Sequence, residues 1–307
     1  MNQNPIDSEV LIVAWHRKLL AVAAIFTVLL IAMGGVLCVT QSIRSCPDWP
    51  GCFGKFIPPL EVSPILEYTH RALAAMSAVL ILGAASAGLV WARRLRWIVF
   101  PPLAAGVLLV EVSYFGAMVV LHGITPGWAA VDVGSALLAT ALMVTAAVIA
   151  QARKSHPALP DRLSFRTPLA RLVLATVTII YGVFTSGVLV AGKNSITACL
   201  GWPIYSLQLY QVDAHGAGNI LRLIFSVIGI FLVIRMFVQV RRSWRERPTV
   251  FRSARWALAA FLLESVLQAL LLIFGFKVSL LVLYTVTAAV FWGLLVMLGV
   301  NAGLESA

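Results

Sequence analysis

The sequence predicts an all-α polytopic membrane protein with eight transmembrane helices, arranged as two pseudo-symmetric four-helix bundles. Of its 307 residues, 61% are hydrophobic and only 11% are charged, and the mean hydropathy is +0.95. Soluble domains carry about 25% charged residues. A motif that occurs once in each half of the chain indicates two structurally equivalent halves. We therefore divide the chain into residues 1–155 and 156–307.

Apolar windows of about 20 residues, the length that crosses a bilayer, predict the individual spans. They are residues 19–39, 64–91, 97–120, 128–150, 169–191, 213–238, 256–275 and 279–301. Each half thus contributes four helices. The first span follows Arg17 and Lys18 and continues into a multi-span chain without a small-residue cleavage site. We therefore expect it to remain as the first helix and not to be removed as a signal peptide.

Basic residues gather on alternate loops, with sixteen on one side of the predicted membrane and four on the other. The rich side holds Arg17, Lys18, Arg93, Arg94, Arg96, Arg153, Lys154, Arg162, Arg166, Arg171, Arg241, Arg242, Arg245, Arg247, Arg252 and Arg255, and the poor side Arg44, Lys55, Lys193 and Lys277. The positive-inside rule places the rich side and both termini in the cytoplasm, with the chain in the inner (cytoplasmic) membrane. The net charge of +11 then reflects topology and contact with membrane lipid, and no nucleic-acid partner is predicted.

The repeated motif is a Cys-x-x-Trp-Pro sequence in each long outer loop, beginning at Cys46 in the first and at Cys199 in the second. Cys52 follows Cys46 in a compartment that permits disulfides, which predicts a disulfide or a redox-active dithiol. Zinc would need further thiolates or imidazoles, which this loop does not offer. The second loop has Tyr205 where a second cysteine would stand. Cys199 is then either a free thiol or the disulfide partner of Cys38. For Cys38 we favour the other interpretation, in which it is simply a small buried apolar residue.

Each motif is followed by a predicted helix with an early histidine, His70 in the first half and His215 in the second. Glu67 lies one turn before His70, and Arg71 follows it directly. Ionisable groups at this depth in a membrane need partners or a ligand. A hydrogen-bonded cluster at the helix start is one interpretation. Repetition in both halves favours a second interpretation, in which the imidazole ligates haem iron. An adjacent arginine would then suit the haem propionates, which it can bind by forked hydrogen bonds.

Three further histidines are given weaker roles. We expect His16 and His156 to be solvated surface residues. His122, at the outer end of the third span, is interpreted as a loop histidine packed beside Pro126 and Trp128, and only secondarily as a replacement ligand.

The sequence resembles haem A synthases over nearly its whole length. The residues that carry the resemblance are Gly34-Gly35-Val36, Cys46-Pro47-Asp48-Trp49-Pro50-Gly51-Cys52-Phe53-Gly54, Pro58-Pro59 and Glu67-Tyr68-Thr69-His70-Arg71. Members of that family are eight-helix proteins that oxidise a methyl group of haem O to the formyl group of haem A for cytochrome oxidases. The resemblance implies haem O as substrate in the first half and haem b as cofactor in the second, each between two histidines. It further implies a catalytic role for Glu67 and a redox role for Cys46 and Cys52.

The resemblance is incomplete at the haem ligands. The family residues that match are Glu67, His70, Cys46, Cys52 and His215. Asp132 and Tyr284 stand where the second histidine of each half is expected. A tyrosine phenolate can ligate ferric haem, and an aspartate near an open coordination position can move protons or organise water. We therefore expect His70 and His215 to bind haem iron, with Arg71, Asp132 and Tyr284 as further cofactor contacts, and either two haems or only one.

Three functions follow from these residues. The first is a haem A synthase-type oxidoreductase, with haem O synthase and cytochrome oxidase assembly components as the partners that the resemblance implies. The second is a degenerate member that acts, with or without haem, as an assembly factor or a subunit of a respiratory complex. The third is a small-molecule transporter, which would also use intramembrane charges such as Glu111 and Glu264. A homo-oligomer is compatible with all three.

Overall fold

The computed structural model describes residues 12–190, 199–202 and 216–306. Within these ranges the chain forms eight α-helices and no β-strand. The helices are α1 (Ala14–Val39), α2 (Val62–Trp91), α3 (Arg96–Leu121), α4 (Pro126–Ser155), α5 (Pro168–Val190), α6 (Gly216–Ser243), α7 (Pro248–Phe274) and α8 (Val278–Leu304). All of them contain a stretch long and apolar enough to cross a bilayer. The predicted membrane protein of eight spanning helices is confirmed.

Several helices extend beyond the predicted spans because the apolar windows exclude polar flanks. Helix α4 continues to Ser155, and α7 begins at Pro248, before Arg252 and Arg255. Proline suits the first turn of a helix because its missing N–H would have no partner there. The predicted start of the sixth span at residue 213 lies outside the described residues, in which α6 begins at Gly216.

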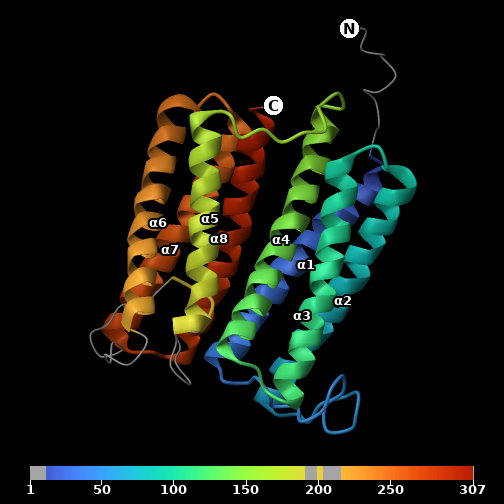
Figure 1. Cartoon of the computed structure of the whole chain (residues 1–307), viewed down its shortest axis with the longest axis vertical. Coiled ribbons are helices and arrows are strands. Elements are labelled where there is room, and N and C mark those ends of the chain that lie inside the picture. The colour runs from blue at the N-terminus through green and yellow to red at the C-terminus, as the bar shows by residue number, and fades with distance from the viewer. Residues whose placement is uncertain (1–11, 191–198, 203–215, 307) are drawn as a thin grey trace.

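The helices form two groups in chain order, α1–α4 and α5–α8 (Figure 1). In each group every helix packs against its sequence neighbour, and the first helix also packs against the last. The groups meet where α1 contacts α8 and where α4 contacts α5 and α8. More than half of the apolar window is buried in α1, α4 and α8, against a third or less in the other helices. These three helices therefore form the centre of the molecule, and the remaining five present apolar side chains to lipid.

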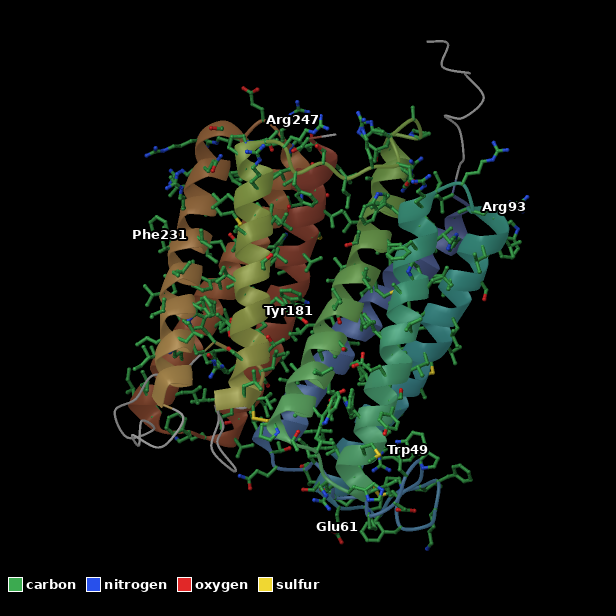
Figure 2. The ribbon with its side chains drawn as sticks, viewed as in Figure 1. Trp49, Glu61, Arg93, Tyr181, Phe231 and Arg247 are labelled. Atoms are coloured by element: carbon green, nitrogen blue, oxygen red, sulfur yellow. A yellow bond between two sulfur atoms is a disulfide. The ribbon has the colours of Figure 1, made fainter. Side chains whose placement is uncertain are left out.

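The two ends of the bundles differ in charge and in loop content. Arg93 and Arg247 lie at one end, whereas Trp49 and Glu61 lie at the other, which carries the first long loop (Figure 2). Helices α2, α4 and α8 begin at this second end, called the loop end below (Figure 1). His70, Asp132 and Tyr284 all lie in the first two or three turns of these helices and therefore near the loop end.

The prediction that His16 is a solvated residue is wrong. Its side chain is buried, and its Nε2 atom lies 3.2 Å from the carbonyl oxygen of Ala84 in α2. The neighbouring helix α2 covers this side of the first turn of α1, and a backbone carbonyl satisfies the imidazole, while Lys18 two positions later is exposed. His156 is exposed, as predicted, and His122 is exposed as well.

Candidate functional site

The first long loop is closed by a disulfide between Cys46 and Cys52, which confirms the predicted pairing. Both cysteines are buried. The carboxylate of Asp48 accepts hydrogen bonds from the backbone N–H groups of Phe53 and Gly54, each at 2.6 Å. The bond from Gly54 contributes most to lowering the pKa of Asp48 below its ordinary value. The loop is therefore a compact unit held by one covalent bond and one ionised side chain.

Two side chains of α2 fasten this loop to the bundle. Glu67 is buried, and its Oε2 atom accepts the N–H of Cys46 at 2.7 Å. Its Oε1 atom pairs with Nη2 of Arg71 at 2.6 Å, one turn further along the helix. Nη1 of Arg71 in turn donates to the carbonyl oxygens of Asp48, at 2.7 Å, and Gly51. Sequence reasoning placed Glu67 at the chemistry and Arg71 on a haem propionate; both roles stay predictions, and the described contacts of both side chains are with the loop.

Replacing Glu67 with alanine should detach this loop. The Glu67 and Arg71 side chains are only 5% and 12% exposed, so the change leaves a cation without its partner in a largely dry environment. Breaking a buried ion pair in this way costs about 3–5 kcal/mol. We expect that loss in unfolding measurements in detergent, together with faster reduction of the Cys46–Cys52 disulfide by a phosphine. Glu61→Ala is the matched control because Glu61 is exposed at the start of the same helix. Equal reduction rates in the two variants would contradict the anchoring role.

His70 lies on α2 between these two anchoring residues and faces α1. Its Cε1 atom is 3.5 Å from the point where a Cβ atom on Gly34 would stand, so the imidazole packs against α1 at this residue. The Nδ1 atom of His70 is buried and has no hydrogen-bond partner among the described residues. Buried imidazole nitrogens normally have a partner, and an axial haem position would supply one. His70 is therefore the candidate iron ligand of the first bundle, and this role stays a prediction.

Asp132 and Glu111 form a second polar group of the first bundle. Glu111 of α3 accepts a hydrogen bond from the hydroxyl of Ser135 in α4 at 2.8 Å. Asp132, one turn before Ser135, is close enough to Glu111 for their charges to interact. Its Oδ1 atom is buried without a partner in the part of the chain that the structure describes. The described hydrogen bonds do not join Asp132 to His70, so its role at the haem stays a prediction.

In the second bundle, residues 199–202 of the second long loop lie buried against the helices. Trp202 donates its backbone N–H to Oε1 of Glu264 in α7 at 2.9 Å. Its carbonyl oxygen accepts a hydrogen bond from the hydroxyl of Tyr284 in α8. The hydroxyl that sequence reasoning assigned to haem iron is thus engaged with the loop. His215 and Tyr205 lie outside the described residues, so the predicted ligand role of His215 stays a prediction.

A second disulfide joins Cys38, at the end of α1, to Cys199. This confirms the weaker of the two sequence interpretations, and the expectation that Cys38 is simply a small apolar residue is wrong. The physical reason is the position of α1 between the two bundles. The C-terminal end of α1, which carries Cys38, reaches the second loop, although the two cysteines are 161 residues apart in sequence.

Comparison with known proteins places these features in a family. The sequence profile of the COX15-CtaA family, described as cytochrome oxidase assembly protein, matches residues 17–296. The chain belongs to this family. It is 29% identical to the haem A synthase of Symbiobacterium thermophilum over 260 residues, which cover 81% of this chain and 82% of that protein. It is 24% identical to the haem A synthase of Staphylococcus saprophyticus over 293 residues, covering 91% and 93% of the two chains.

A third relative, the haem A synthase of an Exiguobacterium species, is 28% identical over 211 residues, which cover 65% of this chain and 66% of that protein. The predicted resemblance to haem A synthases is therefore confirmed. In this cytochrome oxidase assembly protein, Glu67, His70, Arg71 and the Cys46–Cys52 disulfide lie together at the loop end of the first bundle. Tyr284 belongs to a separate cluster in the second bundle.

Proposed function

We propose that this chain is a haem A synthase-type oxidoreductase that converts the methyl group of haem O to a formyl group, with haem O bound in the first bundle. The observation that carries the proposal is the imidazole of His70, whose buried Nδ1 atom has no partner among the described residues. Membership of the cytochrome oxidase assembly family supports it, as do relatives named haem A synthase.

The residues around His70 have distinct tasks in this proposal. His70 holds the iron of the substrate and so fixes the porphyrin against α1 and α2. Glu67 and Arg71 keep the disulfide-closed loop on the loop end of α2, one turn from the imidazole, where it limits entry of water. Oxidation of a methyl carbon to a formyl group takes an oxygen atom from dioxygen or water, passes electrons to an external acceptor and releases protons. The unpartnered carboxyl oxygen of Asp132 is a group that can receive such a proton.

The proposal includes an orientation in the membrane. The arginine-rich end, which carries Arg93 and Arg247, faces the cytoplasm, and both termini lie on that side of the inner membrane (Figure 2). His70 and the Cys46–Cys52 loop then lie near the outer surface. The partners in this proposal are a haem O synthase that supplies the substrate and the cytochrome oxidase assembly components that receive haem A.

The test is production of the formyl haem itself. The full-length chain is expressed with a haem O-forming enzyme in a host that makes no haem A, and the extracted haems are separated by chromatography. We expect haem A to appear, with the absorption of a formyl haem in the reduced pyridine complex. Membranes that contain the chain at a normal level and yield haem O but no haem A would overturn the proposal.

One observation favours a second function, a family member that serves assembly without catalysis. Both carboxylate oxygens of Glu67 and both terminal nitrogens of Arg71 are occupied by contacts within the protein. These two side chains then serve to hold the loop, and haem O could be bound without being oxidised. Haem O that copurifies with the chain while no haem A forms would identify this second function. The family match argues against the transporter interpretation.

A further inference from the structure

We propose that the second bundle holds no haem, because Trp202 and the loop segment that carries it fill the interior where a porphyrin would lie. This inference concerns the cofactor content of the chain and does not depend on the reaction proposed above. It departs from the haem b site that the resemblance implies for the second half.

The indole of Trp202 lies among three helices of the second bundle. The side chain is 5% exposed, and its ring meets Phe261 of α7 edge to face with the ring centroids 5.7 Å apart. Its Cη2 atom is 2.7 Å from the point where a Cβ atom on Gly229 of α6 would stand, and Ile180 of α5 lies 3.3 Å from the same point. Protein interiors are packed as densely as organic crystals. The volume between α5, α6 and α7 therefore cannot also accept a porphyrin.

The backbone beside the indole is fixed from two sides. Glu264 accepts the N–H of Trp202, and Tyr284 donates to its carbonyl oxygen. The ring of Tyr284 also lies directly against Gly201, where a Cβ atom would come within 2.4 Å of Cε1. Only glycine permits this approach. The segment is therefore held in the bundle by specific contacts on both sides of the Trp202 peptide.

The loop is tied down at its other end as well. Cys199 is bonded to Cys38 of α1, and Leu200 packs near Gly35 of the same helix. Residues 199–202 are thus linked to α1, α7 and α8 within four positions of the chain.

Tyr284 itself is unsuited to ligate iron in this arrangement. A tyrosine that ligates haem does so as the phenolate, which has no proton to donate. Here the hydroxyl keeps its proton and donates a hydrogen bond to the carbonyl oxygen of Trp202. Loss of that proton would set a negative oxygen against a carbonyl oxygen inside the bundle, where water cannot screen the repulsion. The described residues of the second bundle therefore do not fit a haem.

The first bundle shows the contrasting arrangement of the same motif. Trp49, the counterpart of Trp202, is 46% exposed and lies at the loop end of the molecule (Figure 2). In the first bundle the buried carboxylate of Glu67 binds the N–H of the motif cysteine, Cys46. In the second bundle Glu264 binds the N–H of the motif tryptophan, three positions later in the motif. Where the carboxylate binds the tryptophan N–H, as at Trp202, the indole is buried. Where it binds the cysteine N–H, as at Cys46, the indole of Trp49 is partly exposed.

The experiment counts haems. The full-length chain is purified from cells supplied with haem, and haem per chain and the absorption spectrum are measured for the wild type, His70→Ala, Tyr284→Phe and Tyr114→Phe. Tyr114 is exposed on α3 and is the matched control for loss of a hydroxyl. We expect at most one haem per wild-type chain, none in His70→Ala, and unchanged content and spectrum in both tyrosine variants.

Two results would overturn the inference. One is two haems per wild-type chain. The other is a haem that remains in His70→Ala and whose spectrum changes when Tyr284→Phe is added. Should Tyr284→Phe fail to fold, haemin titration of the wild type and of His70→Ala still decides the number of sites. A wild-type chain without any haem would support an empty second bundle while removing the basis of the proposed reaction, so the two failures are distinguishable.

Discussion

Replacing His70 with alanine is expected to abolish haem A formation in cells that supply haem O. The imidazole is the group assigned to the substrate iron in the first bundle, and its Nδ1 atom has no partner among the described residues. Removing an iron ligand leaves the substrate without a fixed position relative to the groups that oxidise it, and misplacement of about 1 Å can already cost 10²-fold in rate. The measurement is the ratio of haem A to haem O extracted from membranes that contain equal amounts of protein.

The fold should survive this change, which separates a chemical role from a structural one. Because the buried nitrogen makes no hydrogen bond to the described residues, its loss leaves no polar group unpaired at that point. His156→Ala, which alters an exposed histidine at the opposite end of the molecule, is the matched control and should form haem A at the wild-type level. Imidazole added to the growth medium should partly restore the product by filling the vacated space. Wild-type amounts of haem A from His70→Ala would remove this residue from the mechanism.

Trp202→Ala should produce the largest loss of stability in the second bundle. Truncating a fully packed tryptophan removes its buried apolar surface and leaves a cavity, which costs about 3–5 kcal/mol. The backbone contacts with Glu264 and Tyr284 remain, so the change isolates the side chain. Reversible unfolding in detergent micelles measures the free energy of unfolding.

The matched control is the same substitution in the other copy of the motif. Trp49→Ala removes an indole that is 46% exposed and should cost less than about 1 kcal/mol. Similar losses in the two variants would show that Trp202 contributes no more than its counterpart, and would remove the packing argument for a filled second bundle.

The fold could be predicted from the sequence because hydropathy alone determines where a chain crosses a membrane. Apolar windows of the sequence predicted all eight spans. The errors lie at helix ends, where polar residues continue the helix beyond the window. The Cys46–Cys52 disulfide was predictable because a spacing of six positions within one short loop brings the two thiols together. The pairing of Cys38 with Cys199 depends on α1 lying between the bundles, and this packing leaves no mark on local sequence.

The candidate site was predicted in its composition but not in its contacts. The pattern of Glu67, His70 and Arg71 indicated a cluster near the loop end, and the structure joins Glu67 to Arg71 there. The attachment of both side chains to the loop backbone could not be read from spacing, because it depends on how the loop folds back. His16 was misjudged for a similar reason, since burial at a helix end is decided by the neighbouring helix.

The repeat itself was misleading about tryptophan. Two copies of one motif suggest two equivalent loops, yet Trp49 is largely outside and Trp202 is inside. The difference follows which N–H group a buried carboxylate accepts: Glu67 is on the helix that directly follows the first loop, whereas Glu264 is 62 residues away from Trp202. Local similarity predicted two structurally equivalent halves, and tertiary contacts decided at which residue each loop is attached.

The bond between Cys38 and Cys199 also constrains the order in which the protein matures. Cys38 reaches the loop end of the molecule as soon as α1 inserts, whereas its partner arrives only after α2 to α5 have followed. During that interval Cys46 and Cys52 are the nearest thiols, only a few residues further along the chain. Rapid closure of the pair between Cys46 and Cys52 leaves Cys38 as the only thiol waiting, and thiol–disulfide exchange can correct an early mispairing. A bond between Cys38 and Cys199 therefore requires that the chain has been inserted as far as the second loop, beyond α5.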